Sequence, residues 1–204
     1  MADMQSQKQQ THRAKMQKLK ENIDASIESA TEQRGVFILL TGNGKGKSSS
    51  AFGMVMRALG YGLNVAVVQF IKGEQLSGEE LYLRDQCPQV KFHQMGTGFT
   101  WDTQDRSADI AAAEKSWAVA EQVLADDSYD LVVLDELTYM LSFKYLAQEK
   151  VLKALQSRPH EQSVVVTGRG GGSELAELAD TVSEIKEVKH AYNTGVMARK
   201  GVDF

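Results

Sequence analysis

The sequence contains a single cysteine, Cys87, among its 204 residues. One cysteine cannot form a disulfide within the chain, and it excludes a metal site built from several cysteines. A lone thiol also fits a protein that is kept in a reducing compartment. We therefore expect Cys87 to be a packed or idle side chain.

Long apolar runs and an excess of positive charge are missing as well. No segment reaches the roughly 20 apolar residues that a membrane-spanning helix needs, and the N-terminus lacks the apolar block of a signal peptide. The formal net charge of −4 argues against nucleic acid as the main partner. These absences predict a soluble cytoplasmic protein without a membrane or nucleic-acid partner.

Residues 1–34 differ in composition from the rest of the chain. They are rich in Gln, Lys and Glu and show no strand pattern, but four apolar residues recur at helical spacing: Met16, Leu19, Ile23 and Ile27. We expect a flexible start followed by an amphipathic helix, ahead of a domain that covers residues 35–204. The helix either closes over a second subunit or is a solvated helix packed on its own domain, and the sequence leaves both open.

Short apolar runs alternate with helical stretches from Val36 onward. This alternation is typical of parallel strands joined by helices, so we expect one α/β domain with a mostly parallel central sheet flanked by helices. A helix is expected over residues 107–125, with Trp117 on its core face. Strands are expected at residues 36–40, 65–71, 90–94, 131–134, 163–167 and 182–188.

A glycine-rich stretch between the first strand and the first helix reads as a phosphate-binding loop. Successive backbone N–H groups can turn inward on an anion there, and the helix adds its positive end. The usual pattern is G-x-x-x-x-G-K-[ST], and this loop is one residue short. We expect Lys47 to reach phosphate oxygens, Ser48 to bind Mg²⁺ and Lys45 to assist. The residues assigned to nucleotide binding are Gly42, Asn43, Gly44, Lys45, Gly46, Lys47 and Ser48.

Two further polar clusters follow later apolar runs. Asp135 and Glu136 end the run that begins at Leu131, where a carboxylate commonly holds the metal of a phosphate loop. Either acid can touch the metal, and in an ATPase Glu136 would orient water. Arg169 follows another run and contacts phosphate or ribose, or else is a surface arginine. The carboxyl ends of parallel strands meet at one edge of a sheet, so we expect these clusters to share a site.

Phe99 and Trp101 lie in a glycine-flanked stretch, residues 95–102. Aromatic side chains on such a loop indicate a flat apolar ligand, a partner surface, or a loop folded back over the core. The nearby His93 is either a metal ligand or a structural residue, and a lone histidine is more often structural.

The whole set of motifs resembles the ATP:corrinoid adenosyltransferases, in the branch with a modified phosphate loop and a RecA-like fold. Ser48 stands where many members carry Thr, which leaves the metal-binding hydroxyl in place, and the glycines after Gly170 have no assigned function. The matching stretches are TGNGKGKSSSAFG at 41–53, VVQFIKG at 67–73, GTGFTWDTQ at 96–104, VVLDELTYM at 132–140, TGRG at 167–170, LADTVSE at 178–184 and VKHAY at 188–192.

The resemblance implies transfer of the 5′-deoxyadenosyl group of ATP to the Co(I) centre of a corrinoid, with release of triphosphate. The corrinoid is cobalamin, cobinamide or cobyrinic acid a,c-diamide, the divalent cation is Mg²⁺ or Mn²⁺, and the electron comes from a flavodoxin or reduced flavin. It also implies a homodimer in which the N-terminal helix closes over the partner's site. We connect the short loop with a reversed orientation of ATP, as a hypothesis.

The same resemblance assigns roles to particular residues. Lys47 neutralises the leaving triphosphate, and Phe99 and Trp101 lie under the corrin ring and keep the lower axial ligand off cobalt. Glu136 belongs to the nucleotide and metal site, with Asp135 as its neighbour.

Two other functions use part of the same motif set. A RecA-like ATPase would need Lys47, Ser48, Asp135 and Glu136 but would leave the aromatic stretch unexplained. A kinase of a small metabolite would share the fold and would produce ADP.

Overall fold

The computed structural model describes residues 2–71, 76–94 and 105–204 of the chain. The chain forms two compact units, Met1–Gln33 and Arg34–Phe204. Within the described residues, no helix is both long and apolar enough to cross a membrane.

The first unit consists of one long helix, α1 (Ala2–Ser29). The helix already begins at Ala2, where the sequence predicted a flexible segment ahead of the helix. The reason is local, since residues 2–29 contain neither Gly nor Pro and are rich in good helix formers such as Ala, Gln, Lys and Met. Its apolar stripe is open to solvent within this unit, because the four side chains are 41% to 66% exposed: Met16, Leu19, Ile23 and Ile27.

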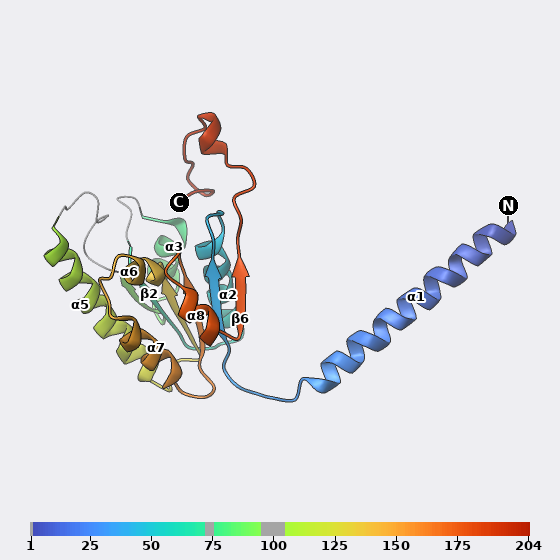
Figure 1. The fold of residues 1–204 in the computed structure, drawn as a ribbon, viewed down its shortest axis with the longest axis horizontal. Helices are drawn as coiled ribbons and strands as arrows, with labels where there is room; N and C mark the ends of the chain where they lie inside the picture. Colours follow the sequence, from blue (N-terminus) through green and yellow to red (C-terminus); the bar gives the residue numbers. More distant parts are fainter. Residues whose placement is uncertain (1, 72–75, 95–104) are drawn as a thin grey trace. The chain divides into compact units, whose positions relative to one another are not determined.

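The second unit is built on a six-stranded sheet with the strand order β3-β2-β4-β5-β1-β6 (Figure 1). Every pair of neighbouring strands is parallel, which confirms the expected α/β class. The strands are β1 (Phe37–Thr41), β2 (Val65–Gln69), β3 (Lys91–Gln94), β4 (Leu131–Asp135), β5 (Ser163–Thr167) and β6 (Thr181–Glu184). The last strand is shorter than predicted, because its pairing with β1 stops where β1 itself ends, at Thr41 and Glu184.

Helices cover both faces of this sheet. Alternate side chains of β4 point to opposite faces, so Val132 and Leu134 join one apolar cluster and Leu131 and Val133 join the other. The helices of the second unit are α2 (Lys47–Gly60), α3 (Gly78–Gln86), α5 (Arg106–Ala125), α6 (Leu137–Ser142), α7 (Gln148–Gln156) and α8 (Ser173–Leu178), followed by a short 3-10 helix, η1 (Ala191–Thr194).

The two apolar clusters on the faces of the sheet contain Trp117 and Cys87, which confirms the packing expected for these side chains. Trp117 is fully buried on α5 and lies against Phe70, with 6.4 Å between ring centroids. Cys87 is buried in the cluster under α2 and α3, so the thiol is a packing residue.

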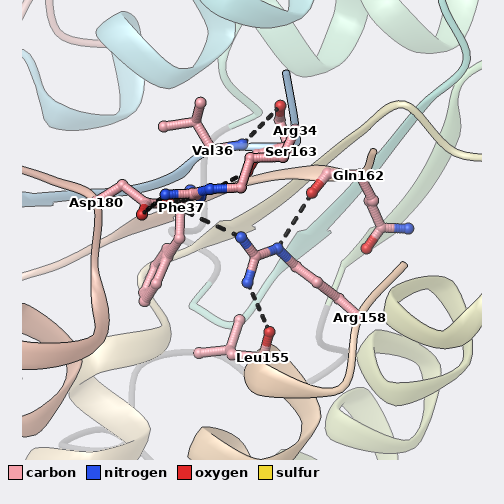
Figure 2. Close-up of polar contacts among 9 residues, drawn as sticks. Arg34, Val36, Phe37, Leu155, Arg158, Gln162, Ser163 and Asp180 are labelled. Carbon is pink, nitrogen blue, oxygen red and sulfur yellow. Dashed lines mark hydrogen bonds and ion pairs between the residues drawn. The ribbon is translucent and has the colours of Figure 1, made fainter. Parts of the chain in front are cut away.

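A polar clamp holds the edge of the sheet at which the strands begin (Figure 2). Asp180, just before β6, accepts hydrogen bonds from both terminal nitrogens of Arg34, at 2.8 and 2.6 Å, and from the backbone N–H of Phe37 at 2.8 Å. Arg158 lies 3.9 Å from the same carboxylate and donates to the carbonyls of Gln162 and Leu155. The clamp therefore ties the start of this unit to β1 and β6.

These contacts favour the ionised form of the Asp180 carboxyl. Hydrogen bonds from Arg34, and then from the Phe37 amide, lower the pKa of Asp180 from 3.8 to about 2. The folded protein thus holds this proton less readily than the unfolded chain does, so the clamp stabilises the fold above the ordinary carboxyl pKa. That contribution is lost as the pH falls through about 2.

We predict that Asp180→Asn lowers the free energy of unfolding at neutral pH by about 1.5 to 3 kcal/mol, the range for a hydrogen bond to a charged group. Urea denaturation measures the difference. The gap between the variant and the wild type should narrow as the pH falls from about 4 to about 2, because both side chains are then uncharged.

Asp85→Asn is the matched control, because Asp85 is exposed on α3. It should change the free energy of unfolding by no more than about 0.5 kcal/mol. Equal stability of Asp180→Asn and Asp85→Asn at neutral pH would contradict the clamp.

Candidate functional site

The predicted phosphate loop connects the end of β1 to the start of α2 and packs against the chain that follows β6. Gly42 has a φ of 98°, and a Cβ placed there would lie 2.4 Å from the carbonyl oxygen of Ile185. The N–H of Gly44 donates to the same oxygen at 2.7 Å. The position after Thr41 therefore requires glycine both for its conformation and for this close approach.

Lys47 is the first residue of α2 and its side chain is buried, with 5% of the residue exposed. The ammonium donates to the carbonyl of Gly44 at 2.9 Å, which curls the lysine back over the loop. Burial lowers the pKa of Lys47, and Glu136 acts in the opposite direction. An ammonium carries three donors, so one carbonyl leaves capacity for an anion.

Asp135 ends β4 and is bound by two neighbouring strands. Its carboxylate accepts from the hydroxyl of Thr167 on β5 at 2.6 Å and from the side-chain amide of Gln69 on β2 at 2.9 Å. Gln94 donates in turn to Gln69 at 2.9 Å and to the buried Glu80 at 2.9 Å. Both oxygens of Asp135 are thus engaged in tying the strand ends together.

Glu136 is the residue whose carboxylate stays available. Its backbone is left-handed, with φ 60° and ψ 24°, and its N–H donates to the hydroxyl of Thr167 at 2.9 Å. The Oε2 atom is buried and has no hydrogen-bond partner among the described residues. Burial, and then the charge of Asp135, raise the pKa of Glu136 to about 7, while Lys47 and Arg169 oppose the shift.

These elements surround a cavity of about 560 Å³ at the edge where the strands end. Seven residues assigned to the site from the sequence line it: Gly44, Lys45, Gly46, Lys47, Ser48, Glu136 and Arg169. The three strand-end clusters therefore meet, as the parallel topology predicts. Gly42, Asn43 and Asp135 are not among the lining residues, and Phe99 and Trp101 lie outside the described residues.

Arg169 reaches the cavity from a turn that runs close against α6. A Cβ at Gly168 would lie 2.1 Å from the hydroxyl oxygen of Thr138, and one at Gly171 would lie 2.3 Å from that of Ser142. Gly171, which had no function assigned from the sequence, thus joins Gly168 in allowing this turn to pass next to α6. The positive charge of Arg169 acts to lower the pKa of both Lys47 and Glu136.

Part of the cavity wall comes from residues that were not predicted from the sequence. Gln69 lines it from the end of β2, and it carries the same signal that identified Asp135, a polar residue at the end of an apolar run. His190 and residues 201–204 also line it. His190 lies in the VKHAY stretch that resembles the family but had no role assigned to it, and no local pattern marks residues 201–204.

His93 does not line this cavity. Burial lowers the pKa of its imidazole, and the charges of Lys91 and Lys115 add to the effect. In the described part of the chain, no group of three or more His, Cys, Asp and Glu side chains is placed to hold a metal. His93 thus takes no part in the lining of this cavity, and its structural role stays a prediction.

Known proteins resemble this chain over almost its whole length. The sequence profile of the family described as ATP:corrinoid adenosyltransferase BtuR/CobO/CobP matches residues 33–204. A corrinoid adenosyltransferase of Pseudomonas aeruginosa is 54% identical over 198 residues, which is 97% of this chain and 98% of that protein. One of Escherichia coli K12 is 50% identical over 193 residues (95% and 97%), and one of Sinorhizobium is 40% identical over 198 residues (95% and 91%).

We predict that Gly42→Ala lowers the free energy of unfolding by at least about 2 kcal/mol, because alanine must adopt a left-handed backbone and overlap the Ile185 carbonyl. Gly53→Ala is the control, since Gly53 lies within α2 and a Cβ there meets nothing within 4 Å. It should raise stability by about 0.5 to 1 kcal/mol. Urea denaturation compares the two variants, and equal stabilities would contradict the close packing of the loop.

Proposed function

The chain belongs to the ATP:corrinoid adenosyltransferases, and we propose that its strand-end cavity holds ATP while the 5′-deoxyadenosyl group passes to the Co(I) centre of a corrinoid. The activity follows from the family, whose profile covers residues 33–204. The assignment of the cavity is supported by one observation above all, the meeting of the phosphate loop, Glu136 and Arg169 around one space.

In the proposed reaction, cobalt is part of the substrate and supplies the electron pair that forms the bond to the ribose 5′ carbon. The bond from that carbon to the triphosphate oxygen breaks, and the oxygen keeps its electrons. The protein must therefore neutralise a highly charged leaving group and hold the carbon toward the cobalt. No water has to be activated.

Lys47 and the loop suit the first of these tasks. The ammonium of Lys47 is fixed above the loop by its bond to the Gly44 carbonyl, so it meets a phosphate oxygen without further ordering. Lys45, Arg169 and the N-terminus of α2 add positive potential around the same space. We assign the triphosphate to this wall, with the loop amides as donors.

The donor set in the cavity fits a divalent cation of the Mg²⁺ type. Glu136 and Ser48 both line the cavity, and the buried Oε2 of Glu136 has no hydrogen-bond partner among the described residues. A carboxylate and a hydroxyl both offer hard oxygen ligands. Asp135 is the weaker candidate, because its oxygens already accept from Thr167 and Gln69. We propose that Ser48 and Glu136 hold Mg²⁺, which would neutralise charge on the triphosphate.

The proposed reaction is tested by supplying MgATP and a prereduced Co(I) corrinoid and identifying the products. We expect triphosphate, seen by phosphorus NMR, in equal amount to a light-sensitive cobalt–carbon product. The control omits the corrinoid and should release no phosphate. Formation of ADP would instead indicate an ATPase or a kinase.

We also propose that Phe99 and Trp101 lie under the corrin ring and keep the lower axial ligand off cobalt. The support is the resemblance of their sequence stretch to the family. Loss of an axial donor lowers the energy of the cobalt orbital that accepts the electron, so Co(II) becomes easier to reduce to Co(I).

Phe99→Ala and Trp101→Ala should therefore slow the reaction from Co(II) about tenfold or more beyond any loss from prereduced Co(I). The two rates are measured side by side with the same reductant and the same ATP concentration. Equal losses in both assays would refute the role.

We propose two partners beyond the substrates. The open apolar stripe of α1 supports a homodimer in which this helix closes over the partner's site, since so much exposed apolar surface favours burial. The need for Co(I) supports a one-electron donor of the flavodoxin or reduced-flavin type.

A further inference from the structure

The chain returns to the phosphate loop after its last strand. Past β6 it forms η1 and then a tight turn near its end, in which the amides of Val202 and Asp203 donate to the carbonyl of Arg199 at 3.2 and 2.8 Å. Figure 1 shows this part of the chain, in red, at the edge of the sheet toward which β6 points. We call residues 190–204 the closing segment.

Asp203 brings the closing segment into contact with the loop. One carboxylate oxygen lies 3.0 Å from the ammonium of Lys45, and the other accepts from the N–H of Arg199 at 2.9 Å. These two hydrogen-bond donors hold the pKa of Asp203 below its ordinary value, so the group is an anion at neutral pH. The cavity is therefore bordered by a negative charge that belongs to the protein.

The negative charge sits where the proposed function places a polyphosphate. Asp203 and its neighbours Gly201, Val202 and Phe204 line the same cavity as the phosphate loop. A triphosphate bound there would attract the Lys45 ammonium and repel the Asp203 carboxylate. Both effects act against the ion pair between Lys45 and Asp203.

The ion pair is weak enough to be exchanged. Its side chains are partly open to solvent, with 42% of Lys45 and 25% of Asp203 exposed, and exposed pairs of this kind contribute little to stability. A triphosphate offers several anionic oxygens to the same ammonium, and charge-assisted bonds to phosphate are stronger.

We propose that Asp203 is an internal counter-ion that competes with the triphosphate for Lys45, so that polyphosphate binding releases the closing segment from the loop. This rests on the proposed function, in that the cavity must bind polyphosphate. Asp203 acts through Lys45 as a positioning residue and sets how tightly ATP and the leaving triphosphate are held.

Calorimetric titration with magnesium triphosphate and with MgATP tests this competition. Asp203→Asn should bind both about threefold to fivefold more tightly than the wild type, the range expected for removing one exposed charge contact. Asp203→Glu keeps the carboxylate and should bind like the wild type. Asp127→Asn, an exposed change in the turn between α5 and β4, is the matched control and should have no effect.

A Lys45→Met background separates competition for the lysine from simple repulsion of the ligand. There, the gain in triphosphate affinity from Asp203→Asn should shrink to less than about 1.5-fold, because the competition for Lys45 is gone and only the direct repulsion between Asp203 and the ligand remains. The same fold-change in both backgrounds would overturn the proposal.

Hydrogen exchange reports on the segment itself. Adding magnesium triphosphate to the wild type should speed exchange in a peptide covering residues 198–204, and Asp203→Asn should show the faster exchange without ligand. Slower exchange on ligand binding would overturn the release.

Failure of the proposed site and failure of the Asp203 role give different results. A wild type that binds neither ATP nor triphosphate would overturn the proposed site together with this inference. A wild type that binds both with unchanged affinity in Asp203→Asn would overturn only the role of Asp203.

Discussion

The hydroxyl of Thr167 makes the contact on which the geometry of the site depends. It donates to the carboxylate of Asp135 and accepts from the amide of Glu136, so two consecutive residues at the end of β4 are bound to the end of β5. A left-handed backbone at a residue such as Glu136 costs about 1 to 3 kcal/mol and persists only where its surroundings hold it. Here the surroundings are the buried ends of β4 and β5, which give the Glu136 carboxylate a rigid base.

The charges of the cavity form one coupled system. The same burial that makes the protonated form of Lys47 less favourable makes the ionised form of Glu136 less favourable, and each charge partly stabilises the other. A polyphosphate would favour the protonated lysine, and a divalent cation would favour the ionised carboxylate. We therefore expect nucleotide and cation to bind together, since the polyphosphate balances the charge of Lys47 and the cation balances the charge of Glu136.

Much of this arrangement was predictable because strong local signals carry it. Apolar runs gave the strands, and the glycines with Lys47 and Ser48 gave the loop. In a parallel sheet the carboxyl ends of the strands lie at the same edge. The positions of Glu136 and Arg169 near the loop could therefore be predicted without knowing any contact between them.

The unpredicted parts lack such signals. The role proposed for Asp203 depends on a contact with Lys45, a residue far away in the sequence, and no local pattern marks Asp203. The sequence also could not predict that Asp135 is engaged by hydrogen bonds while Glu136 stays available. That difference depends on Thr167 and Gln69, which lie on other strands. The end of β6 follows from where its partner strand stops rather than from its own residues.

Strand β6 connects the Asp180 clamp, where the strands begin, to the phosphate loop, where they end. All four of its residues are exposed, so apolar burial contributes little to holding this edge strand. Its place depends on the pairing with β1, on the Asp180 clamp where it begins and on the contact of the Ile185 carbonyl with Gly44 after it ends. The phosphate loop packs on that same carbonyl, and any residue larger than glycine at position 42 would push it away. The loop therefore takes its shape from an edge strand that is fixed by polar contacts at both ends, which makes the distant clamp part of the support of the site.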